Sequence, residues 1–380
     1  MSRTERFILI FLVIIAIFLC ILFTITALGV APVLMHHYKT RLNLPVQVST
    51  WLPANPSPQT SNSTLQGIPP SPSFTPLPEP LCGGPRVMNI LAIGTDSRAN
   101  SYLYGLADVT RVVRVDFVSP KVMLLDFPRD LYVEIPEISH HYGITHGKLN
   151  QAYLYGNPGF GYYDGPGQGP GLLARTLELN FGMPSDHYLA VNMPTFVKIV
   201  DAVGGIDIDL PYAVDGRSEE AGYSSLLYFH AGIHHLNGTQ ALVLGRLRPN
   251  GVFERSKQQN LILAALRDRL LAPSVLQNLP AIFSALSGSV QTDMGLEQLG
   301  WLSCLAPKIT KENIFFATWP ETMFVGTRVD DPILGWTFIW DVDFRLIRAY
   351  VAAFNNGLWP STPPPAAVPS PTLTQIPDLP

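Results

Sequence analysis

The feature that most constrains this chain is an apolar run near its beginning. Residues 7–30 read FILIFLVIIAIFLCILFTITALGV, about 24 residues without a charged side chain. At about 1.5 Å of rise per residue, a helix of this length crosses a hydrocarbon core of roughly 30 Å. A cleaved signal peptide usually has an apolar region of about 7–15 residues followed by an A-x-A-like site. The run is longer than that and no convincing site follows it, so we expect one uncleaved transmembrane anchor.

Proline shows that the rest of the chain is not one uniform domain. The 380 residues include 35 Pro, well above the usual share of about 5%. Proline is concentrated in a Pro/Ser/Thr-rich tract at residues 44–85, whose one charge is Glu79, and in a tail at 357–380. Such tracts cannot bury enough apolar surface to fold, and proline stiffens them into extended spacers. We expect an anchor with its flanks at 1–43, a linker at 44–85, a folded domain at 86–356 and a disordered tail.

Flanking charges decide the orientation of the anchor only weakly. Arg3 and Arg6 precede the run, while Lys39 and Arg41 follow it, so the positive-inside rule has little asymmetry to act on. A spacer beside a membrane span most simply holds a folded domain away from the bilayer. We therefore expect a single-pass protein of the cell membrane, with a cytoplasmic N-terminus and an extracytoplasmic folded domain.

Net charge and cysteine content exclude several classes of protein. Lys and Arg total 25 against 29 Asp and Glu, a formal charge of −4, whereas a nucleic-acid-binding domain is expected to be strongly basic. The three cysteines, Cys20, Cys82 and Cys304, are too few for a disulfide-dense scaffold and have no C-x-x-C spacing. Cys82 and Cys304 could pair outside the cell, although the sequence contains no geometry for that bond.

Within the expected domain, short β-branched runs bounded by turns predict strands, and longer stretches with helical apolar spacing predict helices. Strands interleaved with helices favour an α/β or α+β sandwich around a central sheet. The glycine-rich stretch Gly156–Gly171 is expected to be a flexible loop, because it lacks the G-K-[ST] ending of a P-loop. The expected strands are Met88–Ile93, Val109–Val118, Lys121–Phe127, Ile206–Leu210 and Asn313–Ala317, and the expected helices are Gly171–Phe181, Pro194–Val203 and Glu254–Leu271.

Polar residues gather where the expected strands end. Asp96 and Arg98 follow the run MNILAI, Asp108 precedes VTRVVRVDFV, and Arg129 with Asp130 follows VMLLDF. Loops at the end of a rigid sheet commonly carry function. Carboxylates are hard oxygen ligands for Mg²⁺, and guanidinium groups fork onto phosphate oxygens. Each has a plain structural alternative: a polar turn at Asp96, a strand cap at Asp108 and a surface ion pair at Arg129.

A second basic group lies further along the chain. Arg246 and Arg248 are two residues apart, so on an extended segment they would face the same side and suit a di-anion. Arg255 opens the next expected helix and is followed by Gln258 and Gln259. A solvated basic turn is the alternative. Because the overall charge is slightly acidic, a basic pocket would be local, which favours a small polyanion such as a pyrophosphate, held partly through a divalent metal, over a nucleic acid.

Other catalytic or metal sites have weaker support. A serine hydrolase would need a G-x-S-x-G elbow, which the sequence lacks. Two histidine groups could bind zinc, but neither has a plausible fourth ligand or lies on a clear helix; they are His140, His141 and His146, and His230, His234 and His235.

Five segments occur in a fixed order between about residues 89 and 271: MNILAIGTDSR, ADVTRVVRVDFVSPKVMLLDFPRDLYVEIP, HGKLNQAYLYG, GLLARTLELNFGMPSDHYLAVNMPTFVKIVDAVGGIDIDLP and HAGIHHLNGTQALVLGRLR. Together they resemble the LytR-CpsA-Psr family of cell-envelope proteins, motif by motif and in the family's order. The resemblance does not cover residues 275–356, whose role stays unassigned.

The resemblance implies a three-layer α/β/α domain around a central mixed sheet, with a tunnel for a polyprenyl chain. It also implies transfer of a glycopolymer from a polyprenyl-pyrophosphate carrier to a cell-wall hydroxyl, typically on peptidoglycan, by an enzyme that works at the membrane. Phosphoryl transfer of this kind depends on positioning and charge stabilisation. By motif match, Asp96 and Asp108 would hold Mg²⁺, Arg98 and Arg129 would join them as catalytic residues, and the pyrophosphate would be bound by Arg98, Arg129, Asp130, Arg246, Arg248, Arg255 and Gln259.

The chain departs from the family's pattern at three positions. Leu106 stands where the family commonly has an arginine, Val252 where it usually has an aspartate, and Gln258 where it has another arginine. Glu254 could partly replace the missing carboxylate. These changes raise an alternative from a different class: a non-catalytic relative that binds polyprenyl phosphate or regulates envelope assembly. Transcriptional attenuation has no support from a helix-turn-helix signal or a basic stripe.

Overall fold

The computed structural model describes residues 78–97, 102–217, 228–247, 252–270, 272, 275 and 289–360. At its centre is a six-stranded sheet in the order β11-β6-β1-β2-β3-β12. β6 is parallel to β1 and β12 is parallel to β3, whereas the other neighbours are antiparallel. The sheet is therefore mixed, as expected. Its strands are β1 (Val87–Thr95), β2 (Ala107–Asp116), β3 (Lys121–Phe127), β6 (His187–Asn192), β11 (Gln291–Thr292) and β12 (Ile314–Ala317).

The composition of β1, β2 and β3 explains why they lie at the centre. Successive side chains point to opposite faces of a strand, and a sheet covered on both faces needs apolar residues on both.

The turn between β2 and β3 closes on Asp116, whose Oδ1 accepts hydrogen bonds from the backbone amides of Val118 and Ser119, both at 2.9 Å. In the resulting register Arg111 lies opposite Asp126.

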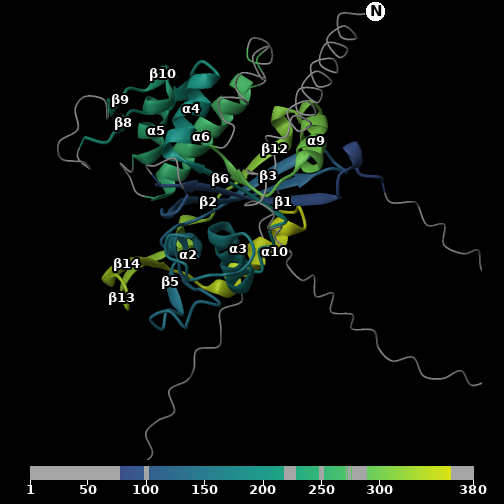
Figure 1. Ribbon diagram of the computed structural model, residues 1–380. Coiled ribbons are helices and arrows are strands. Elements are labelled where there is room, and N and C mark those ends of the chain that lie inside the picture. Colours follow the sequence, from purple (N-terminus) through teal and green to yellow (C-terminus); the bar gives the residue numbers. More distant parts are fainter. Residues whose placement is uncertain are drawn as a thin grey trace, which may run out of the picture.

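Helices α2 (Leu149–Gly156), α3 (Gln168–Phe181) and α10 (Phe344–Asn355) cover the lower face of the sheet in Figure 1. The strands β4 (Tyr132–Glu134) and β5 (His146–Lys148) form an antiparallel pair that leads into α2. The largest core lies in this layer and includes Leu91, Tyr153 and Phe181. Fully burying an apolar side chain contributes roughly 1.5–3 kcal/mol, so this cluster is a principal source of stability.

Helices α4 (Met193–Ala202), α5 (Gly238–Arg246), α6 (Val252–Leu270) and α9 (Leu296–Leu305) lie above the sheet in Figure 1. Asparagines begin two of them: Asn192 accepts a hydrogen bond from Thr195 N and Asn237 from Gln240 N, both at 2.9 Å. Such caps satisfy amides that a helix start leaves without partners. A separate core fills this layer, with two small sheets beside it: β7 (Ile206–Leu210) with β10 (Gly232–Leu236), and β8 (Val214–Asp215) with β9 (Tyr228–Phe229).

The described residues of the segment that the family motifs do not cover, 289–356, contribute strands and helices to the fold. Its hairpin of β13 (Val325–Asp331) and β14 (Gly335–Asp341) projects to one side in Figure 1. Trp340 N donates to Asp130 O at 2.9 Å, which ties the hairpin to the end of β3. Four short 3-10 helices complete the described elements: η2 (Leu81–Gly83), η4 (Ala306–Lys308), η5 (Lys311–Asn313) and η6 (Glu321–Met323).

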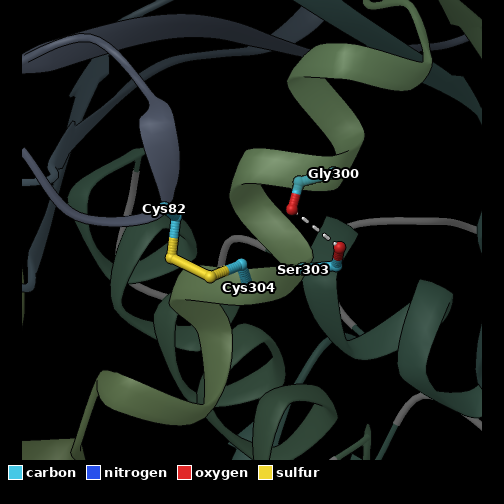
Figure 2. Close-up of a disulfide and its surroundings, with 4 residues drawn as sticks. All are labelled: Cys82, Gly300, Ser303 and Cys304. Carbon is cyan, nitrogen blue, oxygen red and sulfur yellow. Dashed lines mark hydrogen bonds between the residues drawn. A yellow bond between two sulfur atoms is a disulfide. The ribbon is translucent and has the colours of Figure 1, made fainter. Parts of the chain in front are cut away.

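A disulfide joins Cys82 to Cys304, with 5.8 Å between the two Cα atoms. Figure 2 shows that it links η2, just before β1, to the C-terminal end of α9. Beside it a small core forms where Met88, Phe117 and Leu305 are buried. The pairing that the sequence left open is therefore present.

The expectation of an α/β domain with helices on both faces of a mixed sheet is confirmed, and the expected strands and helices appear with shifts at their ends. Sequence patterns missed β6, α2, α9, α10 and the β13–β14 hairpin. The glycine-rich stretch is shorter as a loop than expected, because α3 already begins at Gln168 and its glycines Gly169 and Gly171 are buried. Gly169 lies so close to the side chain of Asn157 that a Cβ there would clash.

The folded part reaches past the expected boundaries of the linker and the tail. Cys82 is held by its disulfide, and Trp359 is buried in the main core. The expected anchor at 7–30, the rest of the linker and the tail from 361 lie outside the described residues. Among the helices that the structure describes, none has the length and hydropathy needed to cross a bilayer.

Candidate functional site

Polar side chains meet at the edge of the sheet where β1 and β3 end and β2 begins. Asp96 follows β1, Asp108 is the second residue of β2, and Arg129 with Asp130 follows β3. The antiparallel register brings Thr95 opposite Ala107 and Thr110 opposite Phe127. Residues far apart in the sequence are therefore neighbours at this edge, as the sequence reasoning required of a site.

The backbone of Leu106 holds both aspartates. Leu106 N donates to Asp96 Oδ1 at 2.7 Å, and Leu106 O accepts hydrogen bonds from the amides of Asp96 at 3.1 Å and Asp108 at 3.0 Å. The loop can come this close because Gly105 has a φ of +136°, and any side chain there would collide with Thr95. Leu106 therefore fixes the carboxylate of Asp96 and the backbones of both aspartates.

Arg129 joins two carboxylates at the end of β3. Its Nη1 donates to Asp108 Oδ1 at 2.5 Å and its Nε to Asp130 Oδ2 at 3.2 Å, while Lys148 Nζ donates to Asp130 Oδ1 at 3.1 Å. Burial works against the charge of Arg129, but the neighbouring carboxylates outweigh it, so the pKa of Arg129 is raised above its ordinary value. Arg129 and Asp108 keep side-chain exposures of 22% and 24%, so this charged pair can be reached from solvent.

Helix α6 brings further predicted residues to the same edge. Arg255 is buried, and its Nη2 lies 3.4 Å from Asp108 O. Gln259 donates through Nε2 to Gly245 O at 3.1 Å and accepts from Arg111 Nη2 at 3.3 Å. Arg255 therefore contacts the strand that carries Asp108, while Gln259 connects α6 to α5 and to the sheet.

Gln258, which stands where the family has an arginine, has a structural role. It is 1% exposed. With its amide oriented to satisfy its neighbours, its nitrogen donates to Leu244 O at 2.9 Å and Leu247 O at 3.1 Å. These carbonyls belong to the last turn of α5 and the residue after it, where a helix leaves acceptors without intrahelical partners. Gln258 thus satisfies the end of α5 with a neutral side chain.

Sequence reasoning missed a buried polar network under α6. Arg111 is 3% exposed and donates to Asn260 Oδ1 at 2.5 Å. Ser256 Oγ donates to Asp126 Oδ2 at 2.6 Å. Burial lowers the pKa of Arg111 from its ordinary value, and the carboxylate of Asp126 opposes that shift. The signal in the sequence was an arginine and an aspartate inside two apolar strands, but their pairing depends on the register.

Of the remaining predicted arginines, Arg246 alone lies among the described residues. Arg246 is the last residue of α5 and is exposed. The expectation of an extended Arg246-x-Arg248 segment is therefore wrong at Arg246, because the helix that Asn237 begins continues through it. Arg98 and Arg248 lie outside the described residues, and so do the side chains of Val252 and Glu254.

Asp96 and Asp108 fit a magnesium ion by their chemistry. Mg²⁺ is usually bound through one or two carboxylates, with water and substrate phosphates completing its shell. Asp108 has a second carboxylate oxygen beside the one that Arg129 contacts. In the described part of the chain no group of three or more His, Cys, Asp or Glu gathers as metal ligands. The pair is too small for structural zinc, which takes four protein ligands.

Comparisons with known proteins agree with the fold and the motifs. The model of the LytR_cpsA_psr family matches residues 84–334. The polyisoprenyl-teichoic acid–peptidoglycan teichoic acid transferase TagV of Bacillus subtilis is 31% identical over 216 residues, which are 55% of this chain and 50% of the relative. The regulatory protein MsrR of Staphylococcus aureus is 28% identical over 218 residues, 56% of this chain and 59% of the relative.

A solved structure has a similar fold. The crystal structure of B. subtilis TagV superposes with a TM-score of 0.54 at 25% identity, covering 72% of this chain and 97% of that one. The sequence matches nevertheless span only about half the length of these curated relatives. The likeness is thus to their shared domain.

Proposed function

The chain belongs to the LytR-CpsA-Psr family, and from that premise we propose that it is a membrane-anchored phosphotransferase. It would move a glycopolymer from a polyprenyl-pyrophosphate carrier to a hydroxyl of the cell wall, on peptidoglycan. The observation that carries this proposal is the cluster of Asp96, Asp108, Arg129 and Arg255 at one edge of the sheet. The TagV relative, whose name describes such a transfer, supports the reaction class.

In this proposal the cations of the cluster bind the pyrophosphate. Asp130 is held by Lys148 and in turn receives Arg129 Nε, so the guanidinium is oriented before a substrate arrives. A phosphate oxygen would replace Asp108 as the partner of Arg129 Nη1 and form a charge-assisted hydrogen bond. Such preorganised cations stabilise charge that develops during transfer without reorganising. Asp96 and Asp108 would hold Mg²⁺, which when bound supplies positive charge to the phosphate oxygens.

The cellular location is part of the proposal. A polyprenyl carrier stays in the membrane, so the enzyme must work beside it, and the apolar run at 7–30 would keep it there. The disulfide between Cys82 and Cys304 supports an extracytoplasmic domain, because disulfides form and persist in oxidising compartments.

The test is transfer of a lipid-pyrophosphate-linked saccharide to peptidoglycan fragments by the full-length protein in detergent with Mg²⁺. Asp96→Ala and Arg129→Ala should each lower kcat/KM by about 10²–10³, the effect of removing one preorganised stabilising group. Arg217→Ala is the matched control, because its ion pair with Asp215 is exposed and includes none of the cluster residues. Transfer at the wild-type rate by both site variants would overturn the assignment.

A second candidate is a non-catalytic relative that binds polyprenyl phosphate and regulates envelope assembly. It is favoured by Gln258, whose amide is engaged by Leu244 and Leu247, and by Leu106, whose contribution to the cluster comes through its backbone. MsrR, which is named a regulatory protein, belongs to the same group of relatives. This candidate requires tight binding of undecaprenyl phosphate with no turnover in the same assay.

A further inference from the structure

Six aromatic rings form a row on the surface beside the cluster. This aromatic row extends from the loop between β1 and β2, across the loop between α2 and α3, to the loop between β4 and β5. Adjacent ring centroids are 5.9, 5.2, 4.4 and 4.1 Å apart along the order Tyr104, Phe160, Tyr162, His141, His140, and Tyr142 lies beside Tyr162 at 6.0 Å.

A buried tyrosine supports the row from below. Tyr155 in α2 is 3% exposed, and its ring centroid is 5.8 Å from those of both Phe160 and Tyr162. Gln151 Nε2 donates to Tyr155 Oη at 2.8 Å, which fixes the supporting ring. The row therefore rests on a rigid helix, which preorganises a binding surface.

Three rings of the row have large solvent-exposed fractions, so they are not part of the core. Tyr142 is 79% exposed, Tyr104 57% and Phe160 37%. Tyr142 also has a φ of +54°, a left-handed conformation that is uncommon for a bulky residue and costs free energy. An exposed, contiguous group of aromatic residues commonly marks a binding surface.

The row begins beside the cluster of Asp96, Asp108, Arg129 and Arg255. Gly159 N donates to Leu103 O at 3.0 Å, which joins the loop carrying Phe160 to the loop carrying Tyr104. Tyr104 is two residues before Leu106, so their backbones are at most about 7 Å apart. Because Leu106 holds Asp96 and Asp108, a molecule lying on the row would reach the reacting centre of the proposed function.

The charges beside the row do not add up to a positive patch. Glu137 and Arg175 offset each other in an ion pair at 2.8 Å, Asp164, two residues after Tyr162, is exposed, and burial together with the carboxylate of Asp331 raises the pKa of Tyr155 to about 12. A polyanionic chain would gain no net attraction here, and a neutral one needs none. A neutral polymer that combines apolar faces with polar edges is a saccharide strand.

We propose that the aromatic row is the subsite that binds the glycan strand of the acceptor. The apolar C–H faces of its sugar rings would stack on Tyr104, Phe160 and Tyr162, as aromatic faces offer amphipathic contact area. Its hydroxyl groups would bond to the phenol and imidazole groups along the row. This inference rests on the proposed function for its acceptor role, and on the geometry of the row for saccharide binding.

Calorimetric titration of the full-length protein in detergent with a hexamer of N-acetylglucosamine tests the binding. Tyr104→Ala and Phe160→Ala should each weaken the affinity about two- to tenfold, since an aromatic contact contributes about 0.5–1.5 kcal/mol. Tyr212→Ala, a tyrosine with 41% exposure after β7, is the matched control and should leave the affinity unchanged. Farnesyl pyrophosphate should bind all of these variants equally, which shows that they fold and that the phosphate site is intact.

The transfer assay separates the two proposals. If the row binds the acceptor, Tyr104→Ala should raise KM for peptidoglycan fragments and leave KM for the lipid-linked donor unchanged. Hexamer binding that depends on Tyr104 in a protein without transfer activity would support the subsite and refute the phosphotransferase. A wild-type protein that does not bind the hexamer, equal binding by both alanine variants, or binding of a poly(glycerol phosphate) chain through these residues would overturn the subsite.

Discussion

The disulfide between Cys82 and Cys304 should be a large contribution to stability, because it closes most of the folded chain into one loop. The two cysteines are 222 residues apart. A cross-link removes loop-closure entropy from the unfolded chain roughly as 2.1 + 1.5R ln n cal/mol/K, which at this separation is about 5 kcal/mol at 25 °C. The bond also holds η2 against α9, next to the core formed by Met88, Phe117 and Leu305.

The perturbation is the double variant Cys82→Ser/Cys304→Ser in the full-length protein. Urea unfolding in detergent, followed by tryptophan fluorescence, should show a free energy of unfolding about 5 kcal/mol lower than that of the oxidised wild type. The midpoint should fall by about the lost free energy divided by the slope m. Trp301 is a suitable probe, because it packs against the core beside the disulfide.

Two controls make this result specific. Wild-type protein unfolded under strong reductant should coincide with the double serine variant, because both lack the same cross-link. Cys20→Ser should behave as the oxidised wild type. A double variant within about 1 kcal/mol of the oxidised protein would refute the loop-entropy reasoning, since engineered and native cross-links otherwise give about 2–5 kcal/mol.

Three further predictions concern the site and its support. Arg111→Met should lower the free energy of unfolding by about 1–3 kcal/mol, because it leaves Asn260 Oδ1 and Gln259 Oε1 without their guanidinium donor, while Arg111→Met/Asn260→Leu should recover part of that loss in a double-mutant cycle; equal losses in both would contradict the argument. Burial raises the pKa of Tyr155 to about 12, so this phenol contributes stability that is full below its ordinary pKa of about 10 and is lost as the pH rises toward 12. Tyr155→Phe should therefore reduce the fall in the free energy of unfolding between pH 10 and 12 by roughly 2 kcal/mol. An unchanged pH dependence of that free energy would contradict this prediction. Asn237→Ala removes the cap of α5 and should cost about 1 kcal/mol, which calorimetry would record as a Tm lower by about 2–4 °C; an unaltered Tm would show that the cap contributes nothing.

Local patterns predicted the central strands well. β1, β2 and β3 are β-branched runs ended by turns, and the pattern of such a run depends on neighbouring residues alone. β6 was missed although its residues alternate between buried and half-buried positions, because His187 and Asn192 at its ends leave only a short apolar run between them. The C-terminal hairpin β13–β14 escaped because most of its first strand is exposed, so its residues carry little apolar alternation. α10 was missed although its buried residues Ile347, Val351 and Phe354 recur with helical spacing, so its local pattern would have predicted it.

Local patterns likewise predicted one part of the candidate site and not another. The motifs identified Asp96, Asp108, Arg129 and Asp130 at strand ends, and the sheet brings these strand ends to one edge. For Arg246 the period of two suggested an extended segment, but the helix that begins at Asn237 continues through it. The metal and the roles of these residues in transfer stay predictions.

By itself the sequence determined the family, the positions of the main strands along the chain, and which polar residues stand at their ends, because these depend on composition and on short-range spacing. Only the tertiary structure decided which of these residues meet. The register of β2 and β3 placed Arg111 opposite Asp126, the close approach at Gly105 brought the backbone of Leu106 against Asp96 and Asp108, and three separate loops assembled the aromatic row. Contacts between distant segments depend on how the whole chain packs, and no local pattern encodes that.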